Sequence, residues 1–147
     1  MAEFPDSTIR FSIASTPAHL PVVRAALDRL CELLGLGEAD RGGIVLAVDE
    51  ALTNIIRHAY HGEADRPIDV HLTRGGAGGD AEALEIRIRD WGERVDRGKI
   101  KSRNLDDVRP GGLGVHIMYN CMDTVDYAHA DGGGTLLTMT RRLSCKE

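Results

Sequence analysis

The order in which two hydrophobic periodicities follow each other most constrains the fold of this chain. Apolar and polar residues alternate over positions 7–13, which predicts a half-buried strand. Two segments follow in which apolar residues recur every three or four positions, as on one face of a helix. The first begins at Ser15-Thr16-Pro17, where a hydroxyl could cap the helix, and ends at Gly35 or Gly37; the second covers positions 39–60.

The rest of the chain predicts two hairpins. Four segments alternate again, and two glycine-rich turns, at 75–79 and 131–134, join them in pairs; the segments are 68–73, 84–89, 124–129 and 135–141. A short apolar helix at 115–121 precedes the second pair. Because strands and helices do not alternate, we expect no parallel doubly wound sheet. The pattern predicts an α+β fold, a two-layer sandwich with helices on one face of a mostly antiparallel mixed sheet.

Length and charge narrow the class of protein. The chain has 147 residues, enough for one domain over 1–147, in which residues 1–6 form a polar tail. Its 18 basic and 23 acidic residues are mixed along the sequence, so we expect no basic face and no direct contact with nucleic acid. No targeting or membrane-spanning segment is apparent, and the three cysteines have no metal-like spacing. A cytoplasmic protein with reduced thiols is expected.

The second helical segment carries a row of polar side chains. Glu50, Asn54 and His58 are four residues apart, so they share one face of an α-helix. The amide oxygen of Asn54 is a suitable ligand for a hard cation, and Glu50 could orient or deprotonate a hydroxyl group. A solvated polar stripe on an amphipathic helix would have the same spacing, and the segment alone does not decide between them.

Asp90-Trp91-Gly92 follows directly on a predicted strand. A carboxylate at the end of a strand can accept a hydrogen bond from an exocyclic amine such as that of adenine. A residue without a side chain two positions later leaves room beside it. An ordinary turn is the alternative interpretation.

Gly111-Gly112-Leu113-Gly114-Val115 opens the short third helix. Bare backbone amides at a helix start, reinforced by the helix dipole, form a site for phosphate groups. Neither standard phosphate-loop pattern matches this segment. The preceding stretch, 93–110, is polar and contains six lysine and arginine residues, and a loop of this length in a compact domain is usually functional or mobile.

Taken together and in this order, the motifs resemble the split-motif ATPases (the GHKL superfamily), which include gyrase, histidine kinases and bacterial anti-sigma factor serine/threonine kinases. The resemblance covers nearly the whole chain. The acid four residues before the asparagine and the ending His58-Ala59-Tyr60 are most similar to anti-sigma factor kinases of the RsbW type. It also implies that the fold is the Bergerat-type ATP-binding fold of that superfamily.

The resemblance implies a role for each motif in binding ATP and Mg²⁺. Glu50 would be the base for the acceptor hydroxyl, Asn54 the magnesium ligand and Asp90 the acceptor for the adenine amine. The segment 93–110 would be the lid over the nucleotide, although Glu93 stands where many relatives have another glycine. The remaining residues expected at the nucleotide are Arg57, His58, Gly92, Gly111, Gly112, Leu113, Gly114, Val115 and Thr135.

The function that the resemblance implies is phosphorylation, with Mg-ATP, of a serine or threonine on an anti-sigma-factor antagonist of the STAS type. The implied partners are that antagonist and a sigma factor, and a homodimer is compatible with the resemblance. An alternative is a nucleotide-dependent module that binds a sigma factor or another regulator without kinase activity. A detached gyrase-like ATPase piece is less compatible, because such enzymes need a further domain to complete the site.

Overall fold

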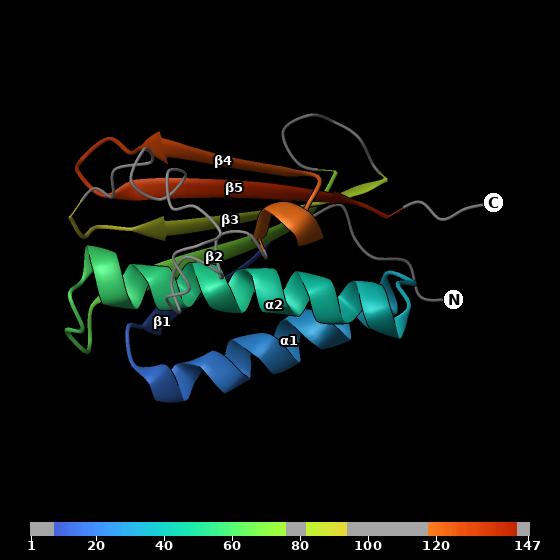
Figure 1. Ribbon diagram of the computed structural model, residues 1–147, viewed down its shortest axis with the longest axis horizontal. Coiled ribbons are helices and arrows are strands. Elements are labelled where there is room, and N and C mark those ends of the chain that lie inside the picture. The colour runs from blue at the N-terminus through green and yellow to red at the C-terminus, as the bar shows by residue number, and fades with distance from the viewer. Residues whose placement is uncertain (1–7, 76–81, 94–117, 144–147) are drawn as a thin grey trace, which may run out of the picture.

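The computed structural model describes residues 8–75, 82–93 and 118–143, and it shows two layers (Figure 1). One layer is a five-stranded sheet, and two long helices lie side by side along one of its faces. The strands are β1 (Thr8–Ala14), β2 (Pro67–Arg74), β3 (Ala83–Asp90), β4 (Thr124–His129) and β5 (Thr135–Arg142). The helical elements are η1 (Pro17–His19), α1 (Leu20–Leu33), α2 (Glu38–Asn54) and η2 (Ile55–Ala59), and residues 118–121 are also helical.

The first helical element begins where Pro17 predicts it, but the expected hydroxyl cap was wrong. Thr16 makes no capping hydrogen bond with its side chain. The hydroxyl of Ser15 instead donates to the carbonyl oxygen of Glu63 at 2.6 Å and accepts from the N–H of Arg66 at 3.0 Å. These long-range partners occupy the single hydroxyl of Ser15, so it does not cap the helix. Ser15 instead links the end of β1 to the segment before β2.

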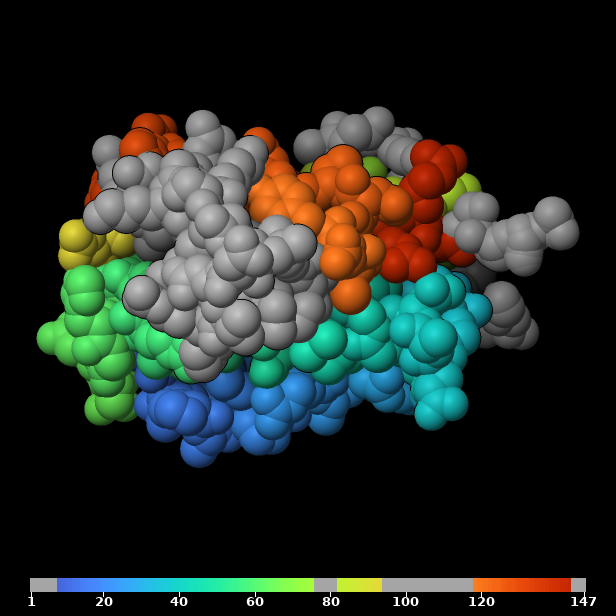
Figure 2. Space-filling model, viewed as in Figure 1, coloured from blue at the N-terminus to red at the C-terminus, as the bar shows by residue number. Residues whose placement is uncertain are grey.

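Helix α2 begins at Glu38 and includes both glycines of the Gly42-Gly43 pair. A Cβ at Gly43 would lie 3.4 Å from Sγ of Cys121, so this turn of α2 faces the helical residues 118–121 closely. Figure 2 shows the atoms of this short helix, in orange, directly against those of α2. Gly43 is therefore the glycine of the pair that faces this short helix, whereas nothing lies within 4 Å of a Cβ added at Gly42.

The sheet has the strand order β1-β2-β3-β5-β4, and every pairing in it is antiparallel. The predicted α+β sandwich is confirmed, with no parallel pair among the described strands. Apolar side chains from β2, β3 and β5 face the helices and form the core with those of α1 and α2, including Val23, Leu27, Val48, Ile68, Val70, Ile86, Ile88 and Met139. Within the described ranges no helix is both long and apolar enough to cross a bilayer.

The register of the sheet sets the position of two polar side chains. Asp90 at the end of β3 is directly opposite Thr135 at the start of β5, and Ile68 of β2 lies on the other side of Asp90. Residues directly opposite each other in an antiparallel pair point to the same face. Because Ile68 is fully buried under the helices, Asp90 and Thr135 also point toward the helical layer.

Candidate functional site

A pocket opens between α2 and the ends of strands β3, β5 and β4. Its lining residues are Ala51, Asn54, Ile55, Asp90, Tyr127, Thr135 and Leu137. Most of them are apolar, and three polar side chains converge among them, which is the usual composition of a small-molecule site. Three of the predicted site residues, Asn54, Asp90 and Thr135, therefore lie together, although they are far apart in the sequence.

The carboxyl group of Asp90 is almost completely buried, with 3 % of the residue exposed. Burial raises its pKa above the usual range, while the N–H groups of Gly92 and Thr135 and the charge of Arg89 oppose this shift. The hydrogen bond from the Gly92 N–H to Oδ1 of Asp90 is 2.9 Å long. These donors hold the carboxyl group at the edge of the pocket, where it can accept a further hydrogen bond from a ligand.

Two other polar atoms in the pocket lack a hydrogen-bond partner among the residues that the structure describes. Nδ2 of Asn54 and Oγ1 of Thr135 are buried and make no hydrogen bond within the described part of the chain. A buried polar group without a partner costs about 1–3 kcal/mol, so such groups are rare and usually have a functional reason. A ligand with polar atoms at its edge would satisfy both groups.

Glu50 lies one turn of α2 before Asn54, outside the residues that line the pocket. Burial raises the pKa of its carboxyl group, the neighbouring charge of Asp49 raises it further, and Arg57 lowers it. Asp49 itself is held by Arg24 of α1, whose Nη1 lies 2.5 Å from its Oδ1. A carboxylate with a raised pKa is a better proton acceptor, because efficient general bases have a pKa near the working pH.

The helix changes its geometry directly after Asn54. The N–H of Tyr60 donates to the carbonyl oxygen of Ile55 at 2.9 Å, and residues Ile55–Ala59 form a π-helical turn, η2. The regular α-helix therefore ends at Asn54, and His58 lies within the π turn. His58 is half-buried and Arg57 is exposed, and neither lines the pocket.

Gly92 has a tight structural environment of its own. A Cβ there would lie 2.4 Å from the carbonyl oxygen of Ala59 and 2.7 Å from Cδ1 of Tyr60. The N–H of Glu93 donates to that same carbonyl at 2.9 Å, and the N–H of Trp91 donates to Oη of Tyr60 at 2.8 Å. The end of the first motif and the second motif are therefore in direct backbone contact, which only glycine at position 92 permits.

Glu93 departs from the glycine of many relatives, and the structure gives it a partner. Its Oε1 lies 2.5 Å from Nε2 of His61, just after η2. The other predicted lid residues, 94–110, lie outside the described residues. So do all five residues of the predicted phosphate turn, Gly111, Gly112, Leu113, Gly114 and Val115.

Sequence reasoning missed four lining residues, Ala51, Ile55, Leu137 and Tyr127. Leu137 and Tyr127 each fall on the inward positions of an alternating strand, so the sequence marks both as core residues. Tyr127 is directly opposite Leu137, and Leu137 is opposite Ile88 of β3. This placement depends on β5 lying between β3 and β4, which the alternating pattern does not specify.

The residues present fit a nucleotide with magnesium better than a metal centre alone. Among the described residues no group of three or more histidine, cysteine or acidic side chains could hold a metal ion. Magnesium usually keeps several water ligands and binds through few protein oxygens together with the phosphates of a substrate. A site that offers one amide, Asn54, beside a pocket of apolar and polar side chains is consistent with that mode.

Comparisons with known proteins show the family to which the chain belongs. The family model described as "Histidine kinase-like ATPase domain" matches residues 13–141. The serine-protein kinase RsbW of Halalkalibacterium halodurans is 27% identical, with 95% of this chain and 86% of the relative covered. The serine-protein kinase RsbW of Bacillus licheniformis is 30% identical, with 92% of this chain and 86% of the relative covered.

Solved structures show the same fold. The crystal structure of the RsbU and RsbW domains of a Mycobacterium tuberculosis protein superimposes with a TM-score of 0.65 at 21% identity. It covers 97% of this chain, which spans about a third (34%) of that longer protein. The family model matches most of the chain, and the RsbW relatives are of similar length. The chain therefore belongs to the histidine kinase-like ATPase domain family, and within it to the group of the RsbW serine-protein kinases.

Proposed function

We propose that this chain is an ATP-dependent protein serine/threonine kinase that acts as an anti-sigma regulatory factor. The observation that carries the proposal is the pocket in which Asp90 and Thr135 lie side by side, with Asn54 facing them from α2. The names of the relatives, serine-protein kinases, support the reaction class. The proposed acceptor is a serine or threonine on an anti-sigma-factor antagonist.

The polar groups of the pocket match the edge of adenine. The Asp90 carboxylate accepts a hydrogen bond from an exocyclic amine, which adenine has, whereas guanine presents a carbonyl oxygen at the corresponding position. The hydroxyl of Thr135 can both donate and accept, so it can pair with a ring nitrogen or with a bridging water. The aliphatic side chains of Ala51, Ile55 and Leu137 then cover the faces of the base.

The transfer chemistry is assigned to the adjacent part of α2. Bound magnesium would neutralise phosphate charge, and Asn54 is the residue proposed to hold it. Glu50 takes the proton from the acceptor hydroxyl, and its raised pKa suits that role. Arg57 is exposed and free to reach a phosphate group. The amides of residues 111–115 remain the predicted phosphate site, and 93–110 the predicted lid.

The proposed protein partners are a sigma factor and an antagonist of the STAS type, both in the cytoplasm. A homodimer is part of the same proposal. Regulation would follow if the two nucleotide states differ in their affinity for the two partners, because a ligand can shift an equilibrium only by such a difference.

Trp91 offers a direct test of nucleotide binding. It is the only tryptophan of the chain, it follows Asp90, and its ring stacks on the guanidinium of Arg89 at 4.5 Å. We expect saturable changes in tryptophan fluorescence with Mg-ATP and Mg-ADP, and a much weaker response to Mg-GTP. A chain that shows no fluorescence change and no thermal stabilisation with either adenine nucleotide would contradict the proposal.

A transfer assay separates kinase activity from binding. With labelled ATP and an antagonist protein, the unaltered chain should transfer the label, and Glu50→Gln should bind Mg-ATP unchanged but transfer at least a hundredfold more slowly, as expected for loss of a general base (about 10²–10⁴). Label transfer that persists undiminished in Glu50→Gln would exclude Glu50 as the base. ATP that stays bound and intact beside the antagonist would favour the binding module without kinase activity.

A further inference from the structure

The outer strand β4 contributes one aromatic side chain to the pocket. Of the described lining residues Tyr127 alone is aromatic, and the six others are aliphatic or small polar residues. We propose that the ring of Tyr127 contacts the nucleotide base and selects purines over pyrimidines. The inference rests on the proposed function, since it assigns a specificity to the same pocket.

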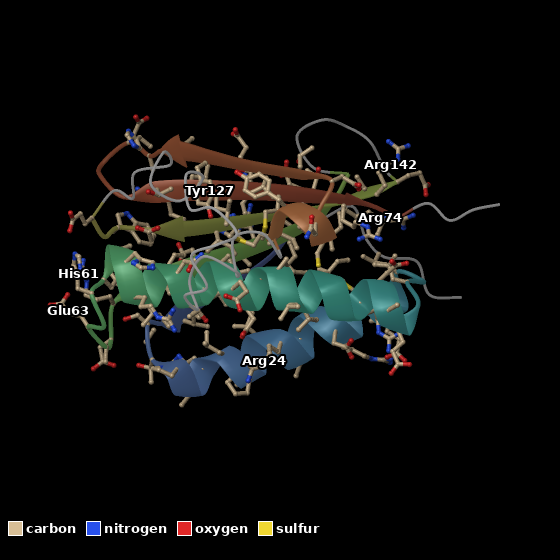
Figure 3. The ribbon with its side chains drawn as sticks, in the orientation of Figure 1. Arg24, His61, Glu63, Arg74, Tyr127 and Arg142 are labelled. Atoms are coloured by element: carbon tan, nitrogen blue, oxygen red, sulfur yellow. The ribbon has the colours of Figure 1, made fainter. Side chains whose placement is uncertain are left out.

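The sheet register places Tyr127 next to the residues that would recognise the base. Tyr127 is directly opposite Leu137 of β5, and Leu137 also lines the pocket. Two residues before Leu137 on the same face of β5 is Thr135, the partner of Asp90. Figure 3 shows the Tyr127 ring lying over β5, the strand that separates β4 from β3.

The hydroxyl group of Tyr127 already has a partner within the protein, so we do not assign it a hydrogen bond to the edge of the base. One of its contacts is Sδ of Met118, 4.0 Å away in the helical residues 118–121. Burial raises the pKa of the Tyr127 phenol, so the group stays neutral at physiological pH. The part of the side chain that the pocket can use is therefore the ring, a flat apolar surface.

A flat surface adds a selectivity that Asp90 alone cannot give. Cytosine, like adenine, presents an exocyclic amine, so a carboxylate that accepts from this amine cannot by itself distinguish ATP from CTP. Base–aromatic stacking grows with the overlapping area, and the two-ring purine covers more of a tyrosine ring than a pyrimidine does. Asp90 would then reject guanine through its carbonyl oxygen, and Tyr127 would reject cytosine through its smaller ring system.

Two substitutions at one position separate the ring from the hydroxyl. Tyr127→Phe keeps the ring and is the matched control, whereas Tyr127→Leu keeps an apolar side chain without a flat face. Dissociation constants for Mg-ATP, Mg-CTP and Mg-GTP are measured by Trp91 fluorescence, and thermal unfolding checks that each variant is folded.

We expect Tyr127→Phe to keep the ATP-to-CTP preference of the unaltered chain. Tyr127→Leu should bind ATP about tenfold more weakly, lose most of that preference and keep the ATP-to-GTP preference, because loss of one base stack is worth about this much. Equal weakening toward ATP and CTP, or no weakening, would overturn the inference. If Tyr127→Leu does not fold, photolabelling of the unaltered chain with 2-azido-ATP tests the contact instead. The label should fall on the peptide that contains residue 127. A label elsewhere would overturn the assignment.

These outcomes also keep the inference separate from the proposed function. If the unaltered chain binds no nucleotide, the proposed function fails and the inference fails with it. If the unaltered chain binds ATP and Tyr127→Leu retains the same ATP-to-CTP preference, only the role of Tyr127 is lost.

Discussion

At the scale of single residues, Asp90 stands in an environment that opposes its charge. The residue is 3 % exposed, and burial raises the pKa of its carboxyl group. The proposed contact with the adenine amine nevertheless requires a hydrogen-bond acceptor there. Burial therefore makes the ionised form of Asp90 less favourable in the folded chain than in the unfolded one, and binding sites often lower stability in this way.

Asp90→Asn tests this effect of burial. Asparagine keeps an oxygen for the Gly92 N–H but has no charge, so the variant should be more stable than the unaltered chain at pH 7 without nucleotide. Because the folded-state pKa of Asp90 lies above its unfolded value, ionisation lowers stability as the pH rises through the folded-state pKa, and the gain should vanish at low pH, where both states of the aspartate are protonated. Urea unfolding at a series of pH values measures this.

The same variant should lose ATP affinity, because the asparagine amide would face the adenine amine donor to donor. Loss of a hydrogen bond to a charged group costs about 1.5–3 kcal/mol, or roughly ten- to a hundredfold in the dissociation constant. A variant that is less stable at pH 7, or that binds ATP as before, would contradict this account of Asp90.

Gly92→Ala should destabilise the chain by about 1–3 kcal/mol, the usual effect of forcing extra atoms into a packed site. The added Cβ would lie 2.4 Å from the carbonyl oxygen of Ala59, which is backbone and cannot swing away. Gly42→Ala is the matched control: it lies inside α2, nothing lies within 4 Å of its added Cβ, and it should stabilise by about 0.5–1 kcal/mol. Equal effects of the two substitutions in thermal unfolding would show that the contact with Ala59 is unimportant.

At the scale of elements, the two motifs on α2 and β3 are joined through Tyr60. Its hydroxyl accepts from the N–H of Trp91 at 2.8 Å and donates to the carbonyl oxygen of Pro67 at 2.6 Å. The guanidinium of Arg66 lies over its ring at 4.5 Å. One buried hydroxyl thus fixes the end of the π turn to the end of β3 and the start of β2.

Tyr60→Phe should lower the free energy of unfolding by about 1–3 kcal/mol, because it leaves a donor and an acceptor at the buried end of the sheet without their partner. We also expect weaker ATP binding, since Asp90 directly precedes Trp91. Chemical denaturation measures the change in stability, provided that the dependence of the unfolding free energy on denaturant concentration is unchanged. The Trp91 fluorescence titration measures the change in ATP affinity. Unaltered stability would mean that water replaces the hydroxyl without cost.

The helix of the first motif shows where prediction from the sequence ends. The three- and four-residue spacing predicted a helix as far as Tyr60, and the structure confirms its extent as α2 followed by η2. The spacing could not reveal the π turn, in which the N–H of Tyr60 donates to the carbonyl oxygen of Ile55. The carbonyl oxygen of Ala59, at the end of this turn, accepts from the N–H of the distant Glu93. Glu50 and Asn54 lie one turn apart within α2, whereas His58 lies in η2 and its place at the nucleotide stays a prediction.

At the scale of the whole molecule, one thiol reports on global stability. Cys31 is fully buried in the core, and burial raises its pKa to about 12. In a Cys121→Ser/Cys145→Ser variant, we expect a thiol reagent to modify Cys31 only when the domain unfolds. Mg-ATP at about 100 times its dissociation constant should slow the modification about a hundredfold by mass action. Rapid modification that ATP does not slow, in a variant that binds ATP, would instead reveal local opening around α1.

Strand order is the other feature that local patterns could not supply. Alternation predicted the hairpins 68–73/84–89 and 124–129/135–141, and both are confirmed as β2–β3 and β4–β5. Nothing local states which strand of the second hairpin joins β3. The pocket depends on this choice, because pairing of β5 with β3 brings Thr135 beside Asp90. The family resemblance, rather than the periodicity, led to Thr135.

The inner position of β5 has a consequence for how the chain is made. Thr135–Arg142 lies between β3 and β4, both of which leave the ribosome before it. Until β5 emerges, β3 exposes an unpaired edge, β4 has no neighbour, and Asp90 lacks the threonine opposite it. A nascent chain therefore gains the nucleotide pocket and closes its sheet in the same step, so ATP can stabilise only chains whose synthesis has passed residue 142.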